Sequence, residues 1–422
     1  MSQATRILIA LVGGLVLGIL LARIAPSVDA VGVAIAEPVG TIWLHGLQMT
    51  IVPLVVGLLV TGIAATAEAA KASRLATRAL VVFIALLWTS SALSAAIFFA
   101  LTSLFPLGPE AAAALKGAVA SASEVGQVPP FSEFLVAMVP TNPLAAAAND
   151  AFLPLIVFTV AFAFAVTRLP HEPRRLLTGV FQAVADAMLI VIGWVLWLAP
   201  LGVFALAFAV GAKAGTAAFG ALIHYVLTVT ACGAGVTLLA FPVAIIGGRL
   251  GLGTYLRAMT QPAAVAVSTQ SSLASLPAML RASEKLGLPV ATSGVVLPLA
   301  VAIFRFTGPA MNLAVALYVA HIFGVQLTAG QVAIGIAAAA ITTMGAVSLP
   351  GTISFVSSIA PIALAMGLPI GPLALLVAVE TFPDIMRTLG NVMMDVAATS
   401  AIGRRSGAVR TEADAILERA PE

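Results

Sequence analysis

Long apolar runs separated by short polar connections follow one another along almost the whole chain. A helix that crosses a membrane needs about 20 predominantly apolar residues, and each run is long enough to form one. The pattern therefore predicts an all-α polytopic membrane protein. We number the predicted spans one to eight in chain order, as Thr5–Ala25, Val39–Ala65, Ala79–Leu104, Phe134–Val166, Phe181–Val210, Ala217–Ile246, Val295–Phe323 and Leu373–Ile402.

Two irregular stretches interrupt this pattern, residues 254–290 before span seven and residues 329–369 before span eight. The first contains the run Ser-Thr-Gln-Ser-Ser at 268–272, and the second contains Ser-Leu-Pro-Gly-Thr at 348–352. Polar, broken backbone at membrane depth is tolerated only where it is buried in protein or lines a cavity. Paired interrupted segments point to a transporter binding site. We therefore predict that each stretch is a re-entrant hairpin of two half-helices, the alternative being two amphipathic surface loops.

The composition removes the other large classes of protein. Hydrophobic residues make up 61% of the 422 residues, charged residues make up 9%, and the mean hydropathy is +1.12. A chain this poor in charge cannot surround a soluble core, and it suits neither disorder nor nucleic-acid binding. The single cysteine, Cys232, allows no disulfide framework, and the sequence has no Walker loop, zinc-protease motif or dinucleotide fingerprint. We expect neither an enzyme nor a resident cofactor.

Basic residues predict how the chain sits in the membrane. If the N-terminus is cytoplasmic, Arg6, the cluster at 71–78, the arginines at 168–175 and those at 404–419 all lie inside, as the positive-inside rule requires. We therefore predict a multi-pass protein of the cell (inner) membrane with both termini in the cytoplasm. Residues 1–403 form the membrane domain and residues 404–422 a charged cytoplasmic tail. The first run resembles a signal peptide, but its length favours a retained span.

Span eight carries Glu380, Asp384, Arg387, Asn391 and Asp395, which we call the polar stripe. The spacings of 4, 3, 4 and 4 residues place all five on one helical face. Ionisable groups in a membrane helix are costly, so they face protein or water. One interpretation is an ion-pair ladder that only holds helices together. The interpretation we favour is a ligand site, because an arginine fork suits a carboxylate, an aspartate suits an ammonium, and Asp395 suits Na⁺ or a proton.

Five motifs in order resemble the dicarboxylate/amino acid:cation symporter family, the glutamate-transporter homologues. The last of them, residues 384–395, matches the pattern D-x-x-R-T-x-x-N-V-x-x-D at every motif position. The motifs lie at Gln48–Pro53, Val139–Pro143, Ala199–Ala205, Ser271–Pro277 and Asp384–Asp395. The resemblance covers nearly the whole chain. It implies eight membrane helices plus two re-entrant hairpins, assembled as a homotrimer, in an elevator-type transporter.

The resemblance also implies a division of the membrane domain. Spans one, two, four and five form the scaffold, while spans three, six, seven and eight and the hairpins 254–290 and 329–369 form the moving transport part. Arg387 takes the distal carboxylate of the substrate, Asp384 takes its α-amino group, and Thr388 and Asn391 add polar contacts.

The two hairpin tips complete the implied substrate site. Ser271 and Ser272 stand where the family's first tip binds the substrate α-carboxylate. Pro350 and Gly351 mark the second tip, which acts in the family as the extracellular gate.

Span seven departs from the family pattern. Counted without gaps from Leu297, the family's Asn-Met-Asp-Gly-Thr cation motif falls on Phe304–Gly308, so its Asn and Asp are missing and Arg305 stands between two phenylalanines. Three roles are open for Arg305. Its fixed positive charge replaces that of a bound Na⁺, it pairs with Glu380 or Asp384, or it is purely structural. Residual cation contacts are expected at four residues, Asn391, Asp395, Thr343 and Glu380, with either Na⁺ or H⁺ as the coupled ion.

We therefore predict a secondary active symporter for an acidic amino acid or a C4-dicarboxylate, coupled to Na⁺ or H⁺. Its expected partners are a small anionic substrate, the lipid bilayer and two further copies of the chain. Alternatives are an anion-conducting channel and a non-transporting scaffold of the same fold. The histidines at 45, 224 and 321 lie in apolar stretches, and we expect them to serve as packing partners.

Overall fold

The computed structural model describes residues 3–72, 74–108, 139–149, 151–214, 217–345 and 351–405, together with residues 110, 112, 113 and 136. Every regular element in these ranges is helical. Six apolar segments among them are long enough to cross a membrane, judged by length and composition. They lie at Thr5–Ile24, Ala30–Ala65, Arg74–Leu104, His171–Trp197, Phe219–Gly247 and Thr292–Phe323.

The first two predicted spans form three helices, α1 (Gln3–Ile24), α2 (Pro26–Gln48) and α3 (Ile51–Ala72). Span one is confirmed by α1. The predicted bounds of span two are wrong, because α2 begins directly after α1 and a break at Met49–Thr50 separates it from α3. Two prolines mark the helix starts, since Pro26 and Pro53 lack the N–H that a helix interior requires.

Helix α10 (Ala199–Ala214) packs closely along α1. A Cβ atom on Gly14 would lie 2.5 Å from the carbonyl oxygen of Phe204, and one on Gly18 would collide with the carbonyl of Phe208. Small residues thus allow the two backbones to approach without intervening side chains.

Span three is confirmed by α4 (Arg74–Leu104). Span four is wrong as a single helix, because the described part contains α7 (Pro143–Ala148) and α8 (Phe152–Arg168), with α7 capped by Asn142. Span five is also two helices, α9 (His171–Trp197) and α10, which meet at Leu198 just before Pro200.

Span six corresponds to α11 (Ala217–Thr237), which continues through α12 (Ala240–Pro242) into the π-helical turn η1 (Val243–Gly247). Span seven is interrupted, as α15 (Val290–Ile303) and α16 (Thr307–Phe323) are separated by residues 304–306. Span eight begins with α19 (Leu373–Leu376) and the 3₁₀ turn η2 (Val377–Val379), and α20 (Thr381–Arg405) follows.

Each irregular stretch forms a pair of short helices packed side by side. The first pair is α13 (Leu252–Thr269) and α14 (Ser272–Lys285), and the second is α17 (Ala329–Gly345) and α18 (Gly351–Ala365). Gln270 turns the first pair with a φ of 51°, in the left-handed region. The predicted half-helices are therefore present, and their re-entry into a membrane stays a prediction.

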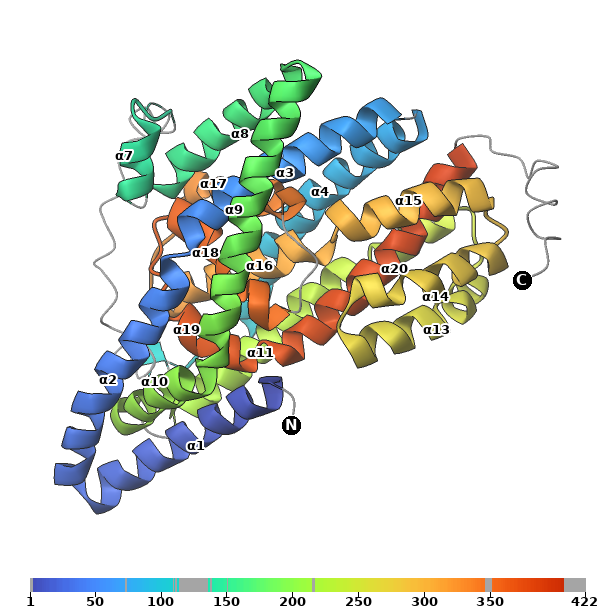
Figure 1. The fold of residues 1–422 in the computed structure, drawn as a ribbon. Helices are drawn as coiled ribbons and strands as arrows, with labels where there is room; N and C mark the ends of the chain where they lie inside the picture. The colour runs from blue at the N-terminus through green and yellow to red at the C-terminus, as the bar shows by residue number, and fades with distance from the viewer. Residues whose placement is uncertain are drawn as a thin grey trace.

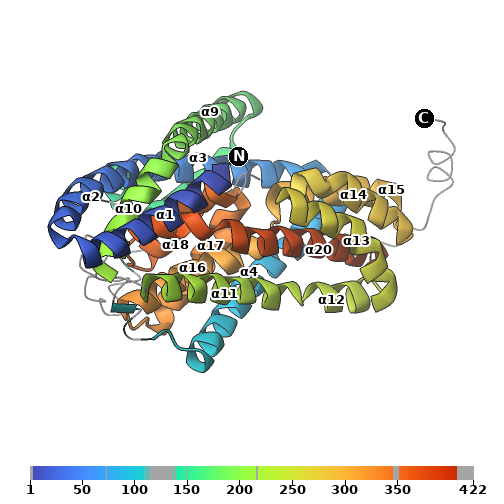
Figure 2. The same ribbon diagram turned by 90° about the horizontal axis from the view of Figure 1, so that it is seen from below.

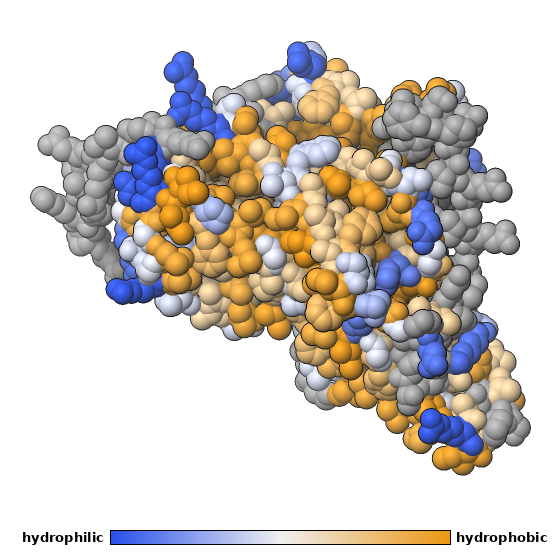
Figure 3. All heavy atoms as spheres, turned by 180° about the vertical axis from the view of Figure 1, so that it is seen from behind, coloured by the Kyte–Doolittle hydropathy of each residue, from blue (hydrophilic) through white to orange (hydrophobic). Residues whose placement is uncertain are grey.

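Helix α16 is the centre of the molecule, and it packs against α4, α11, α17, α18 and α20 (Figure 1). Almost all of its residues are buried. Helices α1, α2 and α10 lie at one end, and α13, α14 and α15 lie at the other (Figure 2). Hydrophobic side chains cover most of the face in Figure 3. A polytopic membrane protein has this surface, because lipid surrounds it.

Candidate functional site

The polar stripe of α20 lies inside the protein. Glu380 is 0% exposed, Asp384 and Arg387 are each 4% exposed, Asn391 is 3% exposed and Asp395 is 1% exposed. The prediction that these groups face protein is confirmed. Such burial is costly for charges unless they are paired or bind a ligand.

Arg387 is the hub of the stripe. Its Nη1 atom forms ion pairs with Glu380 and with Asp384, the latter at 3.1 Å from Oδ1. The predicted ion-pair ladder is thus present at this end of the stripe. It does not use the whole guanidinium, because Nε and Nη2 have no hydrogen-bond partner among the described residues. Two buried donors of a charged group are left for a ligand.

Arg387 lines a small cavity of about 10 Å³. A cavity needs roughly 10–15 Å³ of this kind of volume to hold one water molecule, so the site is nearly closed in this structure and a substrate requires the surrounding helices to separate. Two guanidiniums, Arg305 and Arg387, contribute to it, which favours an anionic occupant. Its lining is Arg305, Gly308, Asn312, Thr343, Phe355, Ser358 and Arg387. Segments from α16, α17, α18 and α20 therefore meet at one site.

The break between α15 and α16 is held by direct hydrogen bonds. The Thr307 backbone N–H donates to Asn391 Oδ1 at 2.8 Å, and its hydroxyl lies 2.6 Å from the Arg387 carbonyl and 2.7 Å from Asn391 Oδ1. Ser90 and Ser94 of α4 donate to the carbonyls of Phe306 and Ala310, each at 2.7 Å. Asn391 Oδ1 and the carbonyls of Phe306, Ala310 and Arg387 therefore each accept a hydrogen bond from a protein donor.

Arg305 lies within this break and has a φ of 37°. A non-glycine residue in the left-handed region is strained, and strain of this kind gathers at functional sites. The flanking Phe304 and Phe306 are fully buried, and the Phe304 ring stacks on Phe83 at 4.3 Å between centroids. The two phenylalanines thus present rings where a cation site needs oxygens.

Asp395 is a separate buried carboxylate further along the stripe. Its Oδ1 atom has no hydrogen-bond partner in the described part of the chain. No group of three or more His, Cys, Asp or Glu side chains that could hold a metal ion is found among the described residues. A lone buried carboxylate requires a proton or a mobile cation, so Asp395 keeps the chemistry expected of a coupling residue.

Of the other predicted site residues, only some lie at the cavity that Arg305 and Arg387 line. Thr343 lines the cavity, and Thr388 is buried on α20. Ser271 caps α14 by accepting the Ala274 N–H at 3.2 Å, and Ser272 is buried, but neither lines the cavity. Gly351 begins α18, and Pro350 lies outside the described residues. The predicted substrate contacts of both tips stay predictions.

Sequence reasoning missed the hydrogen-bonding residues around the break, which are Ser90, Ser94 and Thr307. A signal was present, because Ser90 and Ser94 are one turn apart in the polar run Thr-Ser-Ser-Ala-Leu-Ser at 89–94, in the middle of a long apolar helix. Their partners are 216 residues away, so the signal could not name them.

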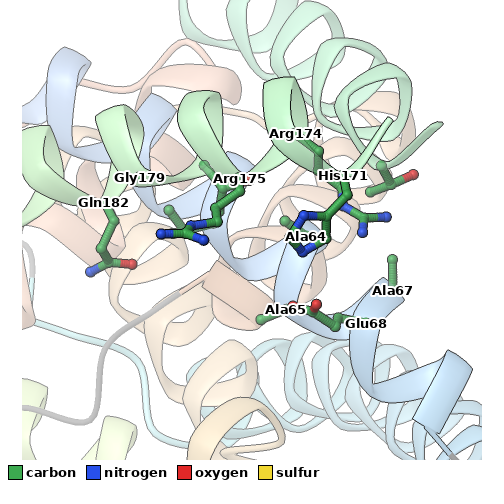
Figure 4. Close-up of a pocket in the computed structure, with 12 residues that line it drawn as sticks. Ala64, Ala65, Ala67, Glu68, His171, Arg174, Arg175, Gly179 and Gln182 are labelled. Carbon is green, nitrogen blue, oxygen red and sulfur yellow. The ribbon is translucent and has the colours of Figure 1, made fainter. Parts of the chain in front are cut away.

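A second, wider hollow of about 480 Å³ lies between the ends of α3, α8 and α9. His171, Arg174 and Arg175 of α9 lie across from Glu68 of α3 (Figure 4). The predicted site residues take no part in this lining. It is a basic surface feature apart from the polar stripe.

Comparison with known proteins identifies the family that this sequence matches. Residues 4–405 match the sequence profile of the sodium:dicarboxylate symporter family. The "Proton/glutamate-aspartate symporter" of Escherichia coli (strain K12) is 29% identical over 418 residues, which cover 96% of this chain and 92% of that protein. The "Proton/sodium-glutamate symport protein" of Bacillus caldotenax is 27% identical, with 94% of each chain covered. The "C4-dicarboxylate transport protein" of Anaeromyxobacter sp. (strain K) is 27% identical, with 93% and 88% covered.

Proposed function

Because the chain belongs to the sodium:dicarboxylate symporter family, we propose that it carries an acidic amino acid or a C4-dicarboxylate across the membrane by cation-coupled symport. It is a multi-pass membrane transporter and not an enzyme. The observation that carries the proposal is Arg387, a buried guanidinium with two unused donor atoms beside a small cavity. The transported cation is a co-substrate, and no resident cofactor is needed.

In this proposal Arg387 binds a substrate carboxylate through Nε and Nη2, the two atoms that the ion pairs leave free. Asp384 receives the ammonium of an amino-acid substrate, and Thr388 and Asn391 add polar contacts. Ser271 and Ser272 of the first tip and Pro350 and Gly351 of the second close around the ligand. Support comes from the pairing of α13 with α14 and of α17 with α18 beside α16 and α20.

We infer that the coupled cation is a proton. Asn391 supports this, because its Oδ1 atom already accepts two hydrogen bonds from Thr307, and Phe304 and Phe306 offer a sodium ion no side-chain oxygen. Glu380 and Asp395 are the proposed proton carriers. Asn391 and Thr343 remain the proposed contacts of any residual sodium site, with Arg305 as a fixed positive charge near it.

We further propose that the protein works as a homotrimeric elevator in the cell (inner) membrane, with both termini and the tail 404–422 in the cytoplasm. The scaffold is formed by predicted spans one, two, four and five, and the rest of the membrane domain moves. The long, largely exposed apolar helix α9 supports a lateral partner for the scaffold.

Uptake of labelled substrate into proteoliposomes tests this function. A pH gradient and a sodium gradient are imposed separately, with aspartate, glutamate and succinate as substrates. Accumulation driven by the pH gradient supports proton symport, whereas steep sodium dependence without a pH effect contradicts the proposed coupling. Current that flows without substrate accumulation would favour the anion-channel alternative, for which the two arginines of one cavity are the attracting charges.

A further inference from the structure

A chain of polar side chains leads from a partly exposed end of α11 to the buried Glu380. His224 of α11 contacts Phe105, just after α4, through Nε2 at 2.8 Å, and contacts Tyr318 of α16 through Nδ1 at 2.9 Å. The rings of Tyr318 and Tyr225 lie 5.2 Å apart between centroids. The Tyr225 hydroxyl donates to Glu380 Oε2 at 3.4 Å. The side chains of this line come from α11, from α16 and from Glu380 just before α20.

His224 can gain or lose a proton without losing either contact. The Phe105 carbonyl only accepts, so Nε2 carries a hydrogen in the contact. In neutral His224, Nδ1 accepts the Tyr318 hydroxyl proton. In charged His224, Nδ1 donates to the Tyr318 oxygen, and that hydroxyl turns to the Ala221 carbonyl, which lies 2.9 Å away. Partners for both states are therefore already in place, as a proton-accepting site requires.

The inner end of the line meets the substrate site. The charged or titratable groups that face Glu380 are Tyr225 from α11 and Arg387 and Asp384 from α20. Those that face His224 are Tyr318 and His321, both from α16. When Glu380 gains a proton, Arg387 loses one of its two carboxylate partners. The guanidinium then becomes more available to a substrate carboxylate.

We propose that His224 takes up the coupled proton and that Tyr318 and Tyr225 pass it to Glu380. Neutral His224 with its hydrogen on Nδ1 gains one proton at Nε2, which then donates to the Phe105 carbonyl, and the Nδ1 proton moves to Tyr318. The Tyr318 proton moves to Tyr225, and the Tyr225 proton moves to Glu380, so both phenols and the imidazole end neutral. The step between the two phenols requires their oxygens to move within hydrogen-bond distance of each other, because in this structure each hydroxyl donates elsewhere.

This relay deepens the proposed function and rests on its proton coupling. It also explains the coupling physically, because substrate and proton favour each other's binding by the same factor. The residues of the relay are distinct from those that contact the ligand in the cavity. Net transport and ligand binding are therefore separable in experiment.

The test compares two modes of transport in proteoliposomes. Net uptake driven by a pH gradient requires a proton to bind and leave in every cycle. Exchange of labelled for unlabelled substrate at equal pH moves the loaded carrier in both directions, so it requires no proton transfer. His224→Gln preserves the two hydrogen bonds without a titratable ring, and Tyr225→Phe removes only a hydroxyl. His321→Gln is the matched control, because His321 stacks beside His224 but lies off the line.

We expect His224→Gln and Tyr225→Phe to slow net uptake about tenfold or more, as loss of a positioned proton-transfer group does, while exchange stays near the wild-type rate. His321→Gln should leave both modes unchanged. Equal loss of net uptake and exchange, or unchanged net uptake in either variant, overturns the relay and leaves the proposed symport standing. Wild-type protein without pH-driven uptake overturns the relay together with the proton coupling.

Discussion

Arg387→Lys isolates the ligand-binding part of the arginine from its structural part. Lysine keeps the positive charge beside Glu380 and Asp384, so the ion pairs that Nη1 makes have a substitute. It lacks the planar fork, so the two donors that the structure leaves for a ligand are replaced by one point charge. Arg387→Ala is less informative, because unpairing buried carboxylates costs about 3–5 kcal/mol in stability.

The expected loss follows from the two unused donors. The fork gives a carboxylate two charged hydrogen bonds, and lysine retains about one of them. A hydrogen bond to a charged group contributes about 1.5–3 kcal/mol, which corresponds to an affinity about 10- to 150-fold weaker. Both succinate and aspartate should lose affinity, because each presents a carboxylate to this position.

Titration calorimetry on purified protein at fixed pH measures this loss. Arg281→Lys on α14 is the matched control, because Arg281 is exposed and lies outside the cavity lining. The melting temperature and gel-filtration volume of both variants should remain those of the wild type. Unchanged affinity of a folded Arg387→Lys protein for both ligands would refute the assignment of Arg387 as the carboxylate contact.

Three further predictions concern the neighbouring groups. Asp384→Asn should weaken amino-acid ligands more than succinate, because only the former carry an ammonium; calorimetry with both ligand types measures this, and equal losses would mean a structural role. Arg305→Met should strengthen sodium binding at any residual site on the order of a hundredfold. The reason is that two unit charges about 6 Å apart repel by roughly 2–3 kcal/mol at an effective dielectric constant near 20. Sodium-dependent uptake that does not change in this variant argues against the prediction. Thr307→Val should lower the free energy of unfolding by about 1–3 kcal/mol, because Asn391 and the Arg387 carbonyl lose a buried donor; thermal melting checks it, with the surface variant Thr260→Val as the control.

Local sequence pattern determined the membrane class and the polar stripe. An apolar run has to be helical in lipid because its backbone groups find partners only within the segment. A spacing of three and four residues places side chains on one helical face whatever surrounds the helix. For these two reasons α1, α4 and the buried stripe of α20 agree with prediction.

Hydropathy alone could not locate the breaks within apolar runs. Span two divides at Met49–Thr50, span five divides at Leu198, and span four divides between α7 and α8. The polar residues at these breaks, Gln48 and Thr50 in span two and Asn149 and Asp150 in span four, are too few to change a hydropathy window. Proline was the available signal, but it is also tolerated in a first helical turn, so it did not decide where each helix ended.

The contacts that give the site its chemistry were decided by tertiary structure. Ser90 meets the Phe306 carbonyl, Thr307 meets Asn391, and Tyr225 meets Glu380, across 216, 84 and 155 residues of sequence. Helical periodicity places a side chain on a face but does not say which helix covers that face. Only the packing of α4, α11 and α20 around α16 brings a hydroxyl to the broken backbone and a tyrosine to the buried carboxylate.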